Sequence, residues 1–101
     1  MKLRCKNNSL RLRLNRSEVN SLAQGAALQE HIVFPGEARL SYVLEPGPGS
    51  LPAATFFDGT VRIGVPADFV RAWAANEEIG LYFDLPAGQA VLKIAVEKDL
   101  E

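Results

Sequence analysis

Apolar and polar residues alternate along most of this chain, and helical spacing interrupts the alternation twice. The alternation from Leu10 to Leu14 predicts a strand with one apolar face, and a shorter strand, 3–6, precedes it. Asn7-Asn8 lies between these strands, and such a pair suits the positive φ angles of a two-residue hairpin turn. The pattern therefore predicts that the chain opens with a β-hairpin.

A helix and a second pair of strands should follow this hairpin. Ser17 is a favourable N-cap, because its hydroxyl can accept from the free amides of a first turn, and Gly25 suits the left-handed stop of a helix that ends near Gln24. The expected buried stripe of this helix is Val19, Leu22, Ala23 and Ala26. The next strands are 28–34, with Leu28, Ile32 and Phe34 inward, and 39–45.

The second half of the chain repeats this order of elements. A hairpin turns at Asp58-Gly59, and Pro66 fits the first turn of a helix that runs to about Asn76. The inward residues of that helix are predicted to be Phe69, Val70, Trp73 and Ala74, and the strands to be 53–57, 60–65, 79–85 and 89–97. The hydrophobic pattern thus predicts ββαββ twice.

A shift of 51 residues places one half on the other. Lys2–Pro35 then aligns with Ala53–Pro86, and Leu40–Glu45 aligns with Leu92–Glu97 after one inserted residue. Identical residues recur at Arg11/Arg62, Pro35/Pro86 and Glu45/Glu97. We therefore expect an α+β fold with an internally duplicated ββαββ unit and a pseudo-two-fold axis. Its eight mainly antiparallel strands and two helices should form a barrel-like or split sheet.

The length favours a single domain over residues 1–101. The Pro/Gly-rich segment 46–52 cannot sustain regular structure and is interpreted as the seam between repeat 1, about 1–45, and repeat 2, about 53–99. Chains as short as either repeat bury too little surface to be stable alone, so the repeats should share one core.

The amino-acid composition of the chain limits the classes of protein to which it can belong. A hydrophobic content of 48% and a charged content of 23% are typical of globular proteins. No apolar run approaches the ~20 residues of a membrane span, and the start of the chain has no signal-peptide pattern. The single cysteine, Cys5, leaves no intrachain disulfide and no metal-ligand spacing. We expect a cytoplasmic protein that has no cofactor, no metal and no membrane association.

Charge is placed unevenly although the net charge is −1. Within the first sixteen residues, the outward phase of the opening hairpin forms a candidate surface for an anion or a partner, composed of Lys2, Arg4, Lys6, Arg11 and Arg13. No exposed aromatic residue interleaves these arginines, and Glu97 and Asp99 could pair with them across strands. The recurrence of Arg11/Arg62 and Glu45/Glu97 favours structural ion pairs, made twice.

Other reactive or aromatic side chains give weaker signals. His31, the only histidine, has no metal-ligand spacing beside it and is expected on the surface. Cys5 has the inward phase of its strand and is expected to be a small buried apolar residue. Trp73 should belong to the core, whereas Tyr82 has an outward phase that suits an interface or a cover for a neighbouring strand.

The ends of the chain carry a more specific pattern, in residues 1–4, 8–14, 17–19, Pro66–Trp73 and Val96–Asp99. These segments resemble a family of small bacterial proteins with no assigned function, whose members begin M-K-[LI]-R-x-x-x-N-S-[LI]-R-x-R-L-x-x-S-E-V and end near V-E-K-D-F. The resemblance implies a Cys-containing tail after the Phe. Because Leu100-Glu101 stands there instead, we expect these two residues to derive from a tag.

The sequence therefore favours a non-enzymatic binding or protein-interaction module over an enzyme. The expected partner is a second copy or another protein. Two alternatives stay open: binding of single-stranded nucleic acid through the basic N-terminal hairpin, and an enzyme or binder that clamps an anionic small molecule with its arginines.

Overall fold

The computed structural model describes residues 1–99 and forms eight strands and two helices over that range, so the predicted α+β class is confirmed. The elements of the first half are β1 (Lys2–Lys6), β2 (Ser9–Leu14), α1 (Arg16–Ala23), β3 (Leu28–Val33) and β4 (Arg39–Gly47). Those of the second half are β5 (Ala53–Phe57), β6 (Thr60–Pro66), α2 (Ala67–Ala75), β7 (Gly80–Ala87) and β8 (Ala90–Lys98). The tag assignment of Leu100 and Glu101 lies outside the described residues.

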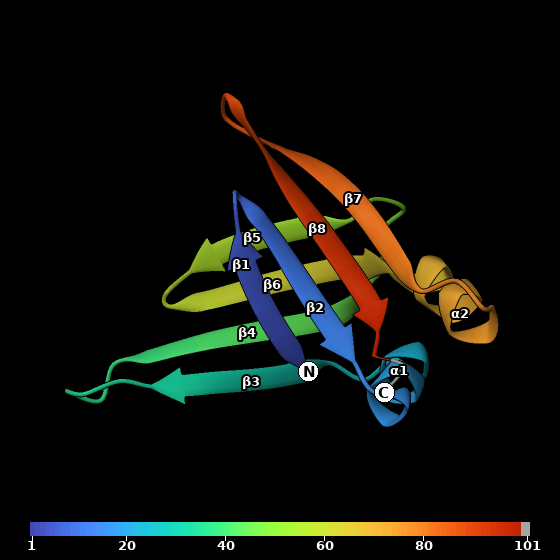
Figure 1. Cartoon of the computed structure of the whole chain (residues 1–101), viewed down its shortest axis with the longest axis horizontal. Coiled ribbons are helices and arrows are strands. Elements are labelled where there is room, and N and C mark those ends of the chain that lie inside the picture. The colour runs from blue at the N-terminus through green and yellow to red at the C-terminus, as the bar shows by residue number, and fades with distance from the viewer. Residues whose placement is uncertain (100–101) are drawn as a thin grey trace.

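The two halves exchange hairpins. Sheet I has the order β1-β2-β8-β7, and sheet II has the order β3-β4-β6-β5, so each sheet takes one hairpin from each half (Figure 1). The hairpins are antiparallel, whereas the central pairs β2–β8 and β4–β6 are parallel. A two-fold rotation that places β1 on β5 and β3 on β7 also places one strand order on the other. This arrangement is consistent with internal duplication.

The sheets remain separate, so the split-sheet alternative is confirmed and the barrel-like one is wrong. They cross face to face, and α1 and α2 lie together at one end, on the right of Figure 1. Between the sheets and the helices lies the core, which contains Leu12, Leu14, Val19, Leu22, Leu44, Ile63, Val65, Val70, Trp73, Ile94 and Val96. Because side chains alternate along the strands, one face of each sheet contributes its apolar residues to this core, and each helix contributes its inward-facing apolar stripe.

The first helix begins earlier than the sequence pattern predicted. Its N-cap is Asn15 and not Ser17: the Asn15 Oδ1 accepts from the Glu18 amide at 2.8 Å, and the Glu18 Oε1 accepts from the Asn15 amide at 2.9 Å. This reciprocal capping box satisfies two backbone donors, which a cap at Ser17 would leave free. Gly25 has the positive φ expected of a helix stop.

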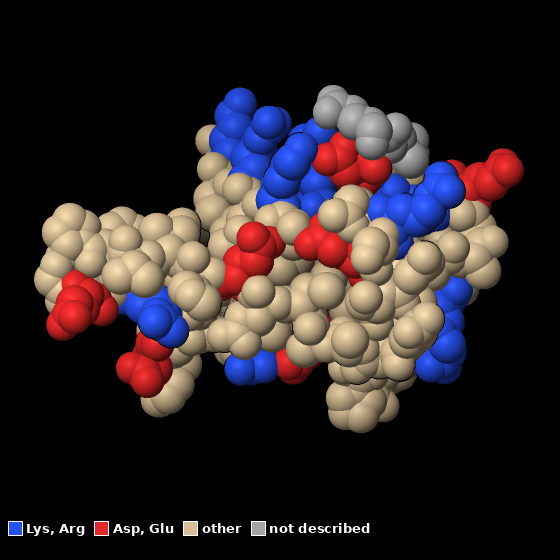
Figure 2. Space-filling view, turned by 90° about the horizontal axis from the view of Figure 1, so that it is seen from below, with Lys and Arg blue, Asp and Glu red and all other residues tan. Residues whose placement is uncertain are grey.

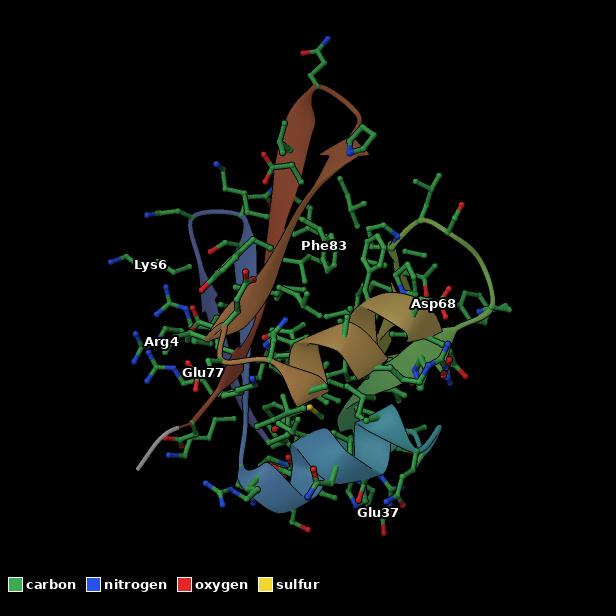
Figure 3. All side chains as sticks on the ribbon, turned by 90° about the vertical axis from the view of Figure 1, so that its right-hand side faces the viewer. Arg4, Lys6, Glu37, Asp68, Glu77 and Phe83 are labelled. Carbon is green, nitrogen blue, oxygen red and sulfur yellow. The ribbon has the colours of Figure 1, made fainter. Side chains whose placement is uncertain are left out.

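Several side chains predicted to be inward are exposed. They are Cys5, Ala26, Ile32, Phe34 and Phe69. For Cys5, Ile32 and Phe34 the inward phase is correct, but crossed sheets cover one another only near the crossing, and the hairpin ends project beyond it (Figures 1 and 3). Inner-face residues near those ends therefore stay open to solvent. Phe69 is partly covered, because it stacks on Phe83 at 6.2 Å between ring centroids.

The seam is shorter than predicted. Strand β4 continues through Pro46 and Gly47, which pair with Val65 and Pro66 of β6. Proline is tolerated there because the pairing ends one residue later. Within residues 1–99, no helix is both long and apolar enough to cross a membrane.

Candidate anion-binding face

Alternation along β1 and β2 directs their basic side chains to the outer face of sheet I, away from the helices. Arg4 and Lys6 project from that side in Figure 3. The strand registers place six cations on or along this face: Lys2, Arg4, Lys6, Arg11, Arg13 and Lys93. Figure 2 shows basic side chains gathered along its upper margin, which is the side toward the viewer in Figure 1. We call this surface the basic face.

The basic face contains a hollow of about 230 Å³, lined by Lys2, Leu3, Arg4, Arg11 and Arg13. Four of these five residues are cations, from two adjacent strands. Registers Lys2↔Arg13 and Arg4↔Arg11 hold the four as opposed cross-strand pairs of like charge. Like charges placed opposite one another are unfavourable unless an anion compensates them. Glu97 and Asp99 contact three of these four cations, and the positive charge that remains makes the hollow a candidate site for an anionic group.

Glu97 is the internal counterion of this face. It is buried, and its Oε1 lies 3.4 Å from the Arg11 Nε and 3.5 Å from the Arg13 Nε. Its Oε2 accepts a hydrogen bond of 2.8 Å from the Tyr82 hydroxyl. One carboxylate thus orients two guanidinium groups and a phenol, while both arginines remain partly exposed.

Gly80 leaves room for the Tyr82 ring. A Cβ at Gly80 would lie 2.8 Å from the Tyr82 Oη and 2.9 Å from its Cζ, so the ring lies directly over this glycine. Tyr82 still exposes 61% of its surface. The hydrogen bond to Glu97 raises the pKa of Tyr82, burial adds to the effect, and the phenol stays protonated at neutral pH.

Strand order brings this tyrosine to the arginines. Cross-strand registers give one row across the basic face, from Arg4 through Arg11 and Ala95 to Tyr82. Tyr82 does not interleave the arginines, but it is an exposed aromatic side chain in the same row, with Ala95 between it and Arg11. Sequence alternation gave the outward phase of Tyr82, but nothing local to β7 indicates that it lies two strands from β2. Gly80 and Lys93 were not singled out for the same reason.

The equivalent face of sheet II has the same ion pair but little positive charge. Arg62 binds Glu45 at 2.6 Å, as Arg11 contacts Glu97 on sheet I. Thr55 opposes Arg62, whereas Arg4 opposes Arg11. The basic face is thus a property of sheet I and not of the strand arrangement that the two sheets share.

On sheet I, Lys2 forms a further ion pair with Asp99 at 3.0 Å, at the rim of the basic face.

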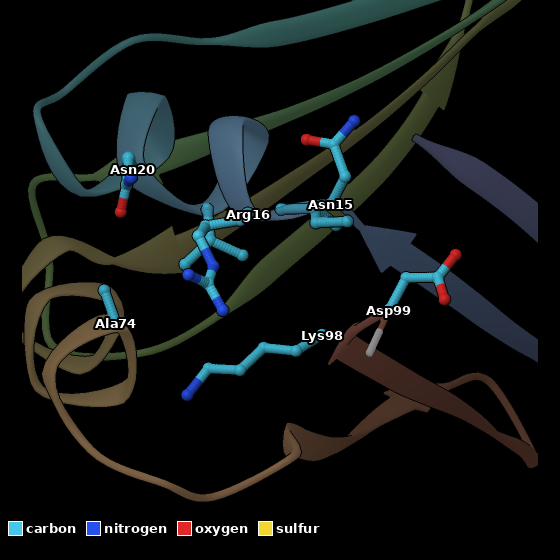
Figure 4. A pocket seen from close by; sticks show the side chains of 8 residues that line it. Asn15, Arg16, Asn20, Ala74, Lys98 and Asp99 are labelled. Carbon is cyan, nitrogen blue, oxygen red and sulfur yellow. The ribbon is translucent and has the colours of Figure 1, made fainter. Parts of the chain in front are cut away.

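The remaining candidates lie apart from this face. His31 is exposed on β3, Trp73 is buried, and the Trp73 indole donates to the Ile79 carbonyl at 3.1 Å. A cavity of about 400 Å³ lies between the helices and the end of β8 (Figure 4). There the Lys98 Nζ donates to the Asn76 carbonyl and lies 5.4 Å from the centre of the Trp73 ring. Structural contacts account for this lysine.

A family model matches residues 1–101 of the chain. The chain belongs to DUF7009, a family of unknown function. Searches of curated proteins and of solved structures gave no significant match. Membership in DUF7009 supports the resemblance seen in the end motifs, and it transfers no activity to any residue.

Proposed function

We propose that this DUF7009 chain is a non-enzymatic module that binds single-stranded nucleic acid on its basic face. The observation that carries the proposal is the row from Arg4 and Arg11 to Tyr82, in which cations and an exposed aromatic side chain share one face of the sheet. Proteins that bind single strands combine a positive track for the backbone with aromatic rings on which bases stack.

The charges support contact with phosphates. Six cations on the face stand against three acids, Asp84, Glu97 and Asp99. Glu97 is buried and contacts the Nε atoms of both arginines, while the two arginine side chains stay partly exposed. Arginines held in this way lose less side-chain entropy when a phosphate binds.

The position of Tyr82 favours a single strand over a duplex. The hydroxyl end of its ring lies against Gly80 and the side chain is exposed, and a base can stack on an exposed ring only when the base is unpaired. Three spacings of about 4.8 Å between neighbouring strands separate Arg4 on β1 from Tyr82 on β7, which is roughly 14 Å in all. A short oligonucleotide can therefore reach both.

Fluorescence anisotropy of labelled single-stranded and duplex oligonucleotides, at low and near-physiological salt, tests the proposal. We expect binding that is tighter for the single strand and that weakens steeply with salt, because each phosphate contact releases counterions. The Arg4→Gln/Lys6→Gln variant removes two exposed cations that touch no buried group. It should lower the salt slope by about 0.7 for each lost contact.

The matched control is Arg39→Gln/Arg71→Gln, which changes the net charge equally at exposed positions off the basic face. Tyr82→Ala should weaken single-strand binding by roughly tenfold or more, the usual contribution of one base–aromatic stack. No binding at low salt, or an equal loss in the control variant, would contradict the proposal. Equal affinity for duplex and single strand would reject the role of Tyr82.

A further inference from the structure

Strand β5 is an unprotected sheet edge. The four edge strands among residues 1–99 are β1, β3, β5 and β7. Three carry charged side chains, such as Lys2 on β1, Glu30 on β3 and Asp84 on β7, and β5 reads Ala-Ala-Thr-Phe-Phe with no charge. Charged residues normally keep edge strands from pairing with other chains. Strand β5 lacks that protection.

The hydrogen-bonding groups at this edge can be assigned from the hairpin. Residues flanking a two-residue turn exchange both hydrogen bonds, and Phe57 pairs with Thr60 around Asp58-Gly59. Alternate residues then bond to β6, so the amide and carbonyl groups of Ala54 and Phe56 point away from the sheet. They form an open template for another strand.

Two large apolar side chains accompany this template. Phe56 is 70% exposed on the inner face of sheet II, and Phe57 is 81% exposed on the outer face. Adjacent phenylalanines that expose this much surface on both faces of an edge strand are unusual in a protein without a partner.

We propose that β5 pairs with β5 of a second copy of this chain, antiparallel, with Thr55 opposite Thr55 at the two-fold axis. In this register Ala54 lies opposite the partner's Phe56, and Ala53 lies opposite the partner's Phe57. Every phenylalanine therefore meets a small alanine, and no like charges meet. The groups freed at Ala54 and Phe56 then form four intermolecular hydrogen bonds, and sheet II becomes a continuous eight-stranded sheet.

The edge of β5 is complementary to itself, and this favours a second copy of the chain as its partner. The two alanines precede Thr55 and the two phenylalanines follow it, so the strand is complementary to an antiparallel copy of itself and suits an isologous contact, in which both copies use the same surface. A five-residue edge buries less than the about 1,600 Å² of a standard interface. The dimer should therefore dissociate on dilution, with a dissociation constant on the order of micromolar.

Sedimentation velocity over a dilution series of the full chain tests this proposal. The chain should shift from dimer to monomer, and Thr55→Arg should be monomeric throughout, because two guanidinium groups would face one another at the axis. Arginine is tolerated at this register position, since Arg4 occupies it on β1. Thr55→Val is the matched control and should dimerise as the parent does.

The register is tested by disulfide trapping in a Cys5→Ser background. Opposed residues in a pair without mutual hydrogen bonds are close enough to be bridged, so Thr55→Cys should form a covalent dimer on mild oxidation. Phe57→Cys should not, because its opposite residue is Ala53. A chain that stays monomeric at the highest concentration reached overturns the proposal. A dimer that persists in Thr55→Arg, or is trapped by Phe57→Cys alone, also overturns it.

Discussion

Glu97 determines the chemistry of the basic face at the scale of single residues. Its carboxylate lies under two arginines and receives the Tyr82 hydroxyl, so removing it would leave like charges uncompensated beside one another. The same contacts hold the aromatic ring and the guanidinium groups on one surface. Under the proposed function, a structural ion pair and a binding surface are not alternatives, since the pair would hold the arginines in place for the ligand.

Gly80 should be intolerant of a side chain. We expect Gly80→Ala to lower the free energy of unfolding by about 1–2 kcal/mol, because the new Cβ displaces Tyr82 and breaks its hydrogen bond to Glu97. Urea denaturation measures the change. Gly64→Ala is the matched control, as a Cβ there meets nothing within 4 Å. Equal effects at both glycines would contradict this account.

The amino group of Met1 should make stability depend on pH. Burial lowers the pKa of this ammonium, but hydrogen bonds to Glu18 and Glu30 and their negative charge outweigh burial, and the pKa is raised above 8.0. Its distance to the Glu30 Oε2 is 2.9 Å. A folded pKa above the unfolded one gives stability that is fully present below about pH 8 and lost as pH rises through the folded value.

Glu18→Gln should therefore reduce the loss of stability between about pH 7 and pH 10, measured by thermal unfolding of protein with a free amino group at Met1. The amide oxygen can still accept from Asn15, so the helix cap survives. Glu77→Gln, at an exposed position, serves as the control and should keep the parent profile. If the pH dependence of stability were the same in Glu18→Gln as in the parent, the ion pair between the Met1 ammonium and Glu18 would contribute nothing to it.

The helix cap is the feature to test at the scale of elements. Asn15→Ala should destabilise the protein by about 1 kcal/mol, because it removes the side-chain acceptor of the capping box, whereas Ser17→Ala should change stability by less than about 0.5 kcal/mol. Chemical denaturation of both variants decides between the two caps. A larger loss of stability in Ser17→Ala than in Asn15→Ala would instead support Ser17, the N-cap predicted from the sequence.

Local patterns predicted the elements well because each is determined within a few residues. Hairpin turns depend on pairs such as Asp58-Gly59, and Trp73 lies in the core as its helical spacing indicated. The pairing of β2 with β8 joins segments from opposite ends of the chain and has no local signal. The position of Tyr82 beside the arginines depends on that pairing, and so does half of the candidate site. Exposure of Cys5 was missed because strand phase does not reveal where the opposite sheet ends.

At the scale of the whole molecule, one framework carries two different surfaces. Sheets I and II share strand order and the Arg–Glu pair, yet sheet I gathers cations and sheet II offers an uncharged edge. The proposed dimer would place the two edges together and leave both basic faces free. Two linked faces would then bind one long strand with higher avidity than either alone.

The exchange of hairpins also sets the order in which the chain can become a folded protein. Translation produces β1 and β2 first, but β8, the neighbour of β2, is the last of the strands in residues 1–99 to be synthesised. Until then the leucines of β2 have no sheet partner on that side, and non-local pairing of this kind is slow. During synthesis from the N-terminus, sheet I therefore cannot form completely before β8 is present. The opening hairpin of the nascent chain must therefore stay uncovered on that side until β8 has been synthesised, a period in which chaperones would bind it.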